Sequence, residues 1–223
     1  MLIAESLFLL LRRDDGKPES AMAQRGYGLA AALVTDLVLA ERITLSDDKD
    51  PRMTVLAADR TGHPALDAAL ARLQERDGKR LSSLVTDGKV AAESRLAEAL
   101  AAAGVIEVEE KRALGLVPAK YPVRDPELER RVREQLRVVL QGGTPRPEDS
   151  TLLAILQGLG VAPKVLAEEK GTLGNRDLKR RIEQVSQDVT AGEAVAKAVA
   201  AMNTAIMTAA ILPAIAAGGA ASG

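Results

Sequence analysis

The chain has 223 residues, enough for one large domain or two small ones. Hydrophobic residues make up 47% of it and aromatic residues only 1%, so leucine, valine, isoleucine and alanine must build the core, as suits helix-on-helix packing. The net charge of −1 excludes general affinity for polyanions, and the absence of cysteine excludes disulfides, thiolate metal sites and thiol nucleophiles.

The N-terminal half begins with two strongly apolar segments. Residues 2–12 are predicted to form a helix that ends at the turn signal Asp14–Asp15–Gly16. A signal peptide is not expected there, because Glu5 precedes the main apolar run and Arg12–Arg13 follow it. Residues 28–42 are predicted to form a second helix, buried on much of its surface because leucine, valine and alanine surround it.

The next segments are shorter. Residues 43–45 and 53–57 have the pattern of two strands joined by a polar turn, which predicts a small hairpin. Residues 64–73 are predicted to form a helix with leucines on one side, and residues 81–85 form another short apolar piece.

The stretch from Glu93 to Leu140 is the most informative part of the sequence. It predicts a helix over 93–103, a β-hairpin over 105–123 and an amphipathic helix that begins near Pro126. A helix leading into a protruding hairpin with basic flanks is typical of a surface that docks on a membrane, a nucleic acid or another copy of the chain.

The C-terminal part continues with helices. Gly142–Gly143 end the basic helix, Asp149–Ser150–Thr151 cap the next one, and a further segment begins at 164–168. A charged helix over 177–189 leads into an alanine-rich helix over 191–212, which we expect to be buried rather than to span a membrane, because alanine drives insertion weakly. The predicted fold class is mainly α, one helical-bundle domain over residues 1–215 with a flexible glycine/alanine tail over 216–223.

No catalytic, metal or cofactor motif is apparent. The single histidine, His63, cannot build a multi-histidine metal site, and nothing in the sequence supplies triad partners, so it is predicted to be an exposed turn residue. No glycine-rich phosphate loop is present, and Glu168–Glu169 have the pattern of solvated charge. The sequence therefore predicts a protein that is not an enzyme and has no cofactor.

The hairpin and the basic helix after it each allow two interpretations. The tip residues Leu114, Leu116 and Val117, beside Lys111 and Arg112, suit shallow membrane insertion or self-association. The same leucines would instead be ordinary core residues if the tip folds back. The arginines within 130–137 form either a docking face or a solvated surface paired with neighbouring glutamates.

Four segments together resemble the Golgi phosphoprotein 3 family, including its bacterial-type members. They are IAESLFLLLRRDDG, GLAAALVTDLVLAERI, SRLAEALAAAGVIEVEEKRALGLVPAKYPV and ELERRVREQLRVVLQGGTPRPEDSTLLAILQGLG. The resemblance covers about residues 2–200 and implies a mostly α-helical domain. It also implies an adaptor that binds phosphatidylinositol 4-phosphate on a membrane surface. In the family the hairpin contributes to contacts with the membrane and with other copies of the protein, and the adaptor holds the cytosolic tails of glycosyltransferases.

The headgroup residues implied by the resemblance do not carry over to this chain. The matching positions are Ala21, Ala30, Val90 and Glu93, where eukaryotic members have one tryptophan and three arginines. Specific recognition of phosphatidylinositol 4-phosphate is therefore not expected. The basic residues that we predict to contact lipid instead are Arg25, Lys89, Arg95, Lys111, Arg112 and Lys120.

These observations predict a peripheral membrane adaptor of the bacterial cytoplasm that contacts anionic lipid or phosphoinositide at the inner face of the membrane. Its expected further partners are protein clients and a second copy of the chain. One alternative is a nucleic-acid-binding helix and wing, which five glutamates on the proposed reading surface disfavour. The other is a scaffold that assembles through the hairpin.

Overall fold

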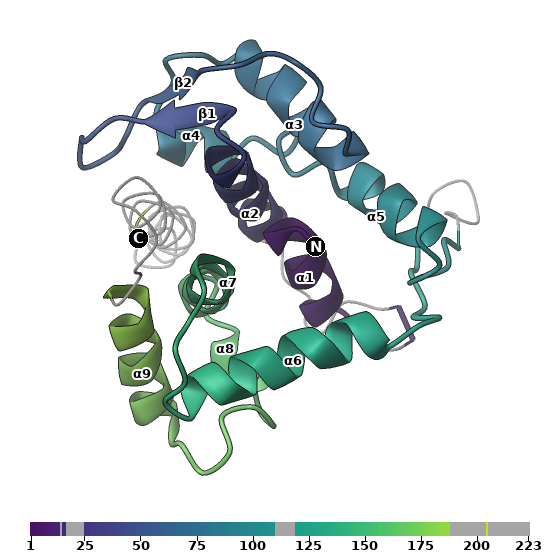
Figure 1. Ribbon diagram of the computed structural model, residues 1–223, viewed down its shortest axis with the longest axis vertical. Coiled ribbons are helices and arrows are strands. Elements are labelled where there is room, and N and C mark those ends of the chain that lie inside the picture. Colours follow the sequence, from purple (N-terminus) through teal and green to yellow (C-terminus); the bar gives the residue numbers. More distant parts are fainter. Residues whose placement is uncertain (14, 17–24, 110–118, 188–203, 205–223) are drawn as a thin grey trace, which may run out of the picture.

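The computed structural model describes residues 1–13, 15–16, 25–109, 119–187 and 204. Within them the chain is mainly α-helical, as predicted, with one two-stranded antiparallel sheet. Two helices occupy the centre of the molecule, α1 (Ile3–Leu10) and α2 (Arg25–Leu39), and they lie against each other (Figure 1). Most residues of both helices are buried because other helices cover them on several sides.

One layer of short elements covers the far end of α2. Strands β1 (Ile43–Leu45) and β2 (Met53–Val55) pair with Leu45 opposite Met53, as the predicted hairpin requires. The helices α3 (Pro64–Gln74), α4 (Leu81–Val85) and α5 (Glu93–Ala102) follow, and α3 packs on both α2 and α5. Figure 1 shows α3 and α5 along one flank of the central pair.

The second layer lies on the other side of α1 and α2. Helix α6 (Glu127–Leu140) crosses the end of α1, and α7 (Pro147–Gly158) contacts both central helices. The short α8 (Ala162–Val165) and then α9 (Asn175–Gln187) pack against α7 (Figure 1). The apolar stripe predicted for α6 is confirmed: Val132, Leu136, Val139 and Leu140 are buried.

A buried carboxylate from α2 caps the start of α1. The Asp36 Oδ1 and Oδ2 atoms accept hydrogen bonds from the backbone N–H groups of Ile3 and Ala4, at 2.9 and 3.0 Å. These amides belong to the first turn, whose N–H groups have no partner within a helix. The contact fixes how the two central helices are positioned relative to each other.

Helix α2 is as long as predicted, but it begins and ends three residues earlier, and its C-terminal end shows why. The N–H of Glu41 bonds to the carbonyl of Val38 and that of Arg42 to the carbonyl of Leu37, the pair of bonds that defines a Schellman motif. Glu41 takes the left-handed conformation, with φ of 53°, so the helix ends before residue 42.

The base of the second hairpin forms as predicted, over residues 105–109 and 119–124. Isolated antiparallel bridges join Ile106 with Val123 and Glu109 with Lys120. The N–H of Glu107 also donates to the carbonyl of Pro122. The tip residues Leu114, Leu116 and Val117 lie outside the described residues, as does the alanine-rich segment 191–212 apart from Thr204.

Three predictions about individual residues were wrong. His63 was predicted to be an exposed turn residue, but its side chain is only 23% exposed: its Nδ1 accepts a hydrogen bond from the N–H of Ala65 and so caps α3, and its Nε2 lies 3.2 Å from Glu5 Oε1. Glu169 is not solvated but 1% exposed, with Oε1 bonded to Arg133. Helix α7 begins at Pro147, before the predicted cap, because Asp149 accepts from the N–H of Arg146.

Candidate functional site

Four charged or aromatic side chains meet where the hairpin base reaches the central helices. Arg12 follows α1, Arg25 begins α2, Glu93 begins α5, and Tyr121 lies in the second arm of the hairpin base, between the bridged residues Lys120 and Val123. We call these four residues the arginine–glutamate cluster. They come from four segments far apart in the sequence, and the fold brings them together.

Arg12 is the buried member of the cluster, with 5% of its surface exposed. Its guanidinium lies 3.4 Å from the ring centroid of Phe8 and 4.8 Å from that of Tyr121, so it contacts both rings, which themselves meet edge to face. Its Nη1 donates to the carbonyl of Phe8 at 2.9 Å and its Nη2 to Glu93 Oε1 at 2.5 Å. A buried guanidinium needs such partners because removing it from water is costly.

Arg25 reaches the same carboxylate oxygen from the solvent side. Its Nη2 donates to Glu93 Oε1 at 3.1 Å, and its side chain is 24% exposed. The Nε of Arg25 is buried and has no hydrogen-bond partner among the described residues. Two guanidinium groups thus converge on one carboxylate, which leaves one positive charge in excess.

Backbone conformation sets the position of this carboxylate and of the tyrosine. Ala92, just before α5, adopts the left-handed region with φ of 41°, which turns the chain so that Glu93 begins the helix beside Arg12. Gly16 has φ of 73° and lies so close to the backbone of Tyr121 and Pro122 that a Cβ there would meet it at 2.5 Å. The backbone at Gly16, after α1, is therefore in direct contact with the backbone of the hairpin base.

Burial shifts the protonation equilibria in the cluster. It lowers the pKa of Arg12 to about 10, against the opposing attraction of Glu93, so the guanidinium stays charged at neutral pH. Burial and the Glu93 charge raise the pKa of the Tyr121 hydroxyl. The cluster is a permanently cationic site with one carboxylate inside it.

The basic residues predicted to contact lipid have different surroundings. Arg25 belongs to the cluster, whereas Arg95 is exposed on α5 and pairs with Glu98 at 2.7 Å. Lys89 is exposed in the turn before α5, and Lys120 belongs to the hairpin base. Lys111 and Arg112 lie outside the described residues, so their share in a common surface stays a prediction.

The positions matched to the family headgroup residues fall mostly in the interior. Ala30 and Val90 are both fully buried in the hydrophobic core, and Ala21 lies outside the described residues. Only Glu93 borders solvent, with 30% of its side chain exposed, and it is neutralised by the two arginines.

Sequence reasoning missed Arg12, because a basic pair after an apolar helix has the appearance of an exposed helix end. The available signal was weak: Arg12 lies four residues after the only phenylalanine, the spacing that places two side chains on one helix face. No local pattern indicates that Glu93, 81 residues away, would supply the counter-charge.

The basic face of α6 is a paired surface. Arg130 and Arg131 contact Glu127, and Arg137 contacts Glu134, so the interpretation of a solvated, charge-paired face describes these residues. Arg133 bonds instead to Glu129 and Glu169 and ties α6 to the segment after α8.

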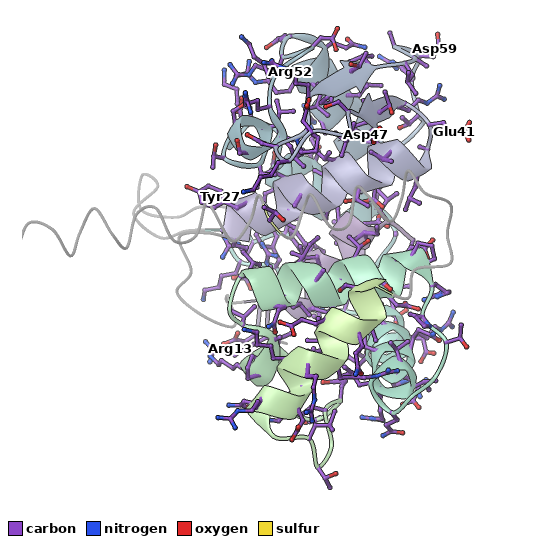
Figure 2. All side chains as sticks on the ribbon, turned by 90° about the vertical axis from the view of Figure 1, so that its left-hand side faces the viewer. Arg13, Tyr27, Glu41, Asp47, Arg52 and Asp59 are labelled. Atoms are coloured by element: carbon purple, nitrogen blue, oxygen red, sulfur yellow. The ribbon has the colours of Figure 1, made fainter. Side chains whose placement is uncertain are left out.

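A cleft between this face and α8 is lined by mixed charges, those of Arg12, Arg13, Asp15, Glu129, Arg133, Lys164 and Glu168. Figure 2 shows Arg13 at the surface on the side of the molecule where Tyr27 lies near the start of α2, with Glu41 just beyond the opposite end of that helix. Because both cations and carboxylates line it, the cleft has no single sign of charge.

Metal and membrane-spanning features were searched for in the described ranges. No group of three or more histidine or acidic side chains there is arranged to hold a metal ion. None of the helices described is both long enough and apolar enough to cross a bilayer.

The fold and the site together define a class of protein: a mainly α-helical domain around two buried central helices, with a hairpin whose base carries a cationic cluster. The sequence model of the Golgi phosphoprotein 3 (GPP34) family matches residues 2–202, and the chain therefore belongs to that family. The family consists of adaptor-type proteins that interact with membranes, phosphoinositides and proteins. A sequence search of curated proteins finds no match.

Proposed function

We propose that this chain is a peripheral membrane adaptor of the bacterial cytoplasm that binds an anionic lipid surface through its hairpin and the basic residues around the hairpin base. The observation that supports the proposal most strongly is the arginine–glutamate cluster, where two arginines face one carboxylate beneath the hairpin. Membership of the Golgi phosphoprotein 3 family supports the same general role.

The expected binding is weak and reversible. A lysine or arginine near an anionic membrane contributes about 1 kcal/mol, and the tip leucines would add a shallow apolar contact. Because Ala30 and Val90 are buried, no preference for phosphatidylinositol 4-phosphate over other anionic lipids is expected at equal surface charge.

Co-sedimentation with vesicles of neutral lipid, generic anionic lipid and phosphatidylinositol 4-phosphate, the last two at matched charge, tests this proposal. The wild type should bind both anionic types alike and the neutral one not at all. A variant with Lys111, Lys120 and Arg112 changed to glutamine should lose most of this binding.

A matched control removes the same charge at the other end of the molecule. Lys49, Arg60 and Lys79 are exposed around β1, β2 and α3, and their replacement by glutamine should leave binding nearly unchanged. Equal loss in both triple variants would show a non-specific charge effect, and wild-type binding to neither anionic vesicle would refute the proposal.

Self-assembly through the hairpin is the second function that an observation favours. Val108, in the first arm of the hairpin base, is 40% exposed, which is unusual for a large apolar side chain among the described residues. Light scattering of the wild type and of Leu114→Asp distinguishes the two: a drop in mass in the variant indicates an oligomer contact. Unchanged mass together with weaker vesicle binding indicates a lipid contact.

A further inference from the structure

We infer that a cavity between α6 and the segment after α8 binds a small primary amine, held as an ammonium ion by the buried carboxylate of Glu169. The inference goes beyond the proposed function and does not depend on membrane binding. Free amines and lysine side chains carry the same alkylammonium group; we assign the site to a free amine.

The cavity is small and lies beside a larger one. It adjoins the mixed-charge cleft between α6 and α8, with which it shares Glu129, Arg133 and Glu168. Its volume is about 240 Å³, which is less than that of common ligand pockets but several times that of a water molecule. A cavity of this size suits a compound of a few heavy atoms.

The observation that carries the inference is one buried oxygen. Glu169 is 1% exposed and lines the cavity, and its Oε1 accepts a hydrogen bond from Arg133 Nη1 at 3.1 Å. Its Oε2 is buried and has no hydrogen-bond partner among the described residues. Burying a carboxylate oxygen without a donor is costly, and a proton on that oxygen would equally lack an acceptor. The oxygen therefore calls for a donor that the described residues do not supply.

Arg133 does not supply this donor, because its hydrogens are used elsewhere. Its Nη1 donates to the carbonyl of Val165 at 3.0 Å as well as to Glu169 Oε1, and its Nε donates to Glu129 Oε1 at 2.8 Å. The two other arginines of the lining are paired with glutamates on the exposed face of α6. None of these guanidinium groups bonds to Glu169 Oε2.

The lining selects the class of ligand. Anions are disfavoured because the carboxylates of Glu129, Glu134 and Glu168 line the cavity together with that of Glu169. A metal ion is disfavoured because no three histidine or acidic side chains within the described ranges are arranged to hold one. A primary ammonium group combines a compact positive charge with three hydrogen-bond donors, so it can satisfy Glu169 Oε2.

A second carboxylate lies at the mouth of the cavity. Glu168 is exposed, lines the same cavity as Glu169, and forms no ion pair with another described residue. A linear diamine presents two ammonium groups, one for the buried carboxylate and one for the exposed carboxylate. We therefore expect a diamine to bind more tightly than a monoamine of the same length.

Calorimetric titration of the full chain at pH 7 with diaminobutane, in about 0.15 M sodium chloride to screen surface charges, tests the inference. Diaminobutane should bind the wild type with a Kd of about 1 mM or lower, and butylamine about threefold more weakly. Tetramethylammonium has the positive charge of butylamine but no N–H donor, so it should not bind. No binding of diaminobutane, or equal binding of tetramethylammonium, would overturn the inference.

Three glutamate variants assign the binding to the cavity. Glu169→Gln keeps the shape of the side chain and removes its charge, and it should weaken diaminobutane binding about tenfold or more. Glu168→Gln should weaken diaminobutane about threefold and leave butylamine unchanged. The matched control is Glu98→Gln, at an exposed position on α5, which should bind both amines like the wild type. Wild-type affinity in Glu169→Gln would contradict the inference.

Thermal unfolding covers the case in which Glu169→Gln does not fold because Arg133 loses a partner. A ligand that binds only the folded state raises Tm as its concentration increases. Diaminobutane should raise the Tm of the wild type and raise that of Glu168→Gln less. An equal rise with tetramethylammonium would indicate a general salt effect and overturn the inference.

Nα-acetyl-lysine amide distinguishes the two sources of the ammonium group. Its backbone is bulky and lacks a second ammonium group, so it should bind more weakly than diaminobutane. Equal or tighter binding of the lysine compound would overturn the assignment to a free amine and indicate a lysine of a protein partner. Absence of vesicle binding would refute the proposed membrane function and leave these titrations unaffected.

Discussion

Arg12 connects three elements, because its side chain contacts α1, α5 and the hairpin base. Its guanidinium contacts Phe8, Tyr121 and Glu93 from a position with almost no exposure to solvent. A neighbouring arginine, Arg13, is half exposed and only 3.9 Å from Asp15. Two adjacent residues of one type therefore have very different energetic roles.

Arg12→Ala should lower the free energy of unfolding by about 2–4 kcal/mol, because it removes a buried ion pair and leaves the carbonyl of Phe8 without its partner. Arg13→Ala should change it by less than about 0.5 kcal/mol. Urea unfolding at pH 7 measures both, and similar losses in the two variants would contradict the assigned role of Arg12.

Asp36 provides a test of pH dependence. Burial raises its pKa from 3.8 to about 7, despite the hydrogen bonds from Ile3 and Ala4, and the nearby Glu5 raises it further. A carboxyl whose pKa is higher in the folded state favours folding fully below about pH 4. This contribution is lost as the pH rises to about 7.

Unfolding experiments between pH 4.5 and 7.5 measure this loss, whose slope cannot exceed about 1.4 kcal/mol per pH unit for one group. Asp36→Asn does not titrate and still offers one acceptor to the start of α1, so its stability should vary less over this range. The same pH slope in wild type and Asp36→Asn would exclude Asp36 as the cause.

The ends of the helices are decided by backbone geometry as much as by apolar pattern. Helix α2 stops at Leu39 because Glu41 adopts a left-handed conformation and completes the Schellman motif. A side chain in that conformation is strained, which glycine avoids.

Glu41→Gly should therefore raise the free energy of unfolding by about 0.5–1 kcal/mol, since relief of strain outweighs the added freedom of the unfolded chain. Glu134→Gly, at an exposed position within α6, should lower it by about 1 kcal/mol. Thermal unfolding of the two variants gives opposite shifts if the motif is as described; a destabilised Glu41→Gly protein would argue against it.

At the scale of the whole molecule, the hairpin base packs on Gly16, just after α1, whose carbonyl accepts a hydrogen bond from the N–H of Tyr121. Gly16 permits this because its φ of 73° suits glycine and because no Cβ separates it from the backbone of Tyr121 and Pro122. The hairpin base, the arginine–glutamate cluster and the central helices are therefore in direct contact.

Gly16→Ala should destabilise the fold by about 2 kcal/mol or more, since it adds both strain and a clash with backbone, and it should weaken vesicle binding by displacing the hairpin. Gly62→Ala is the control: φ there is 84°, but a Cβ would meet nothing within 4 Å. It should cost only the backbone strain and leave vesicle binding intact. Equal effects on binding would indicate that the hairpin base is independent of this turn.

Apolar periodicity and turn residues act over a few positions, so they were sufficient to predict the described helices, the β1–β2 hairpin and the base of the second hairpin. The stripe of Val132 and Leu136 on α6 is the clearest case. The sequence also indicated Arg25 as a candidate site residue.

Which charged side chains are buried, and which partners they have, depends on contacts between segments that are far apart in the sequence. Arg12 and Glu93 meet across 81 positions, and Glu169 turns inward toward Arg133, 36 positions away. The local sequence does not reveal whether a charged side chain is buried. The free-energy cost of burying a charge depends on its partners, which only the fold brings into contact with it.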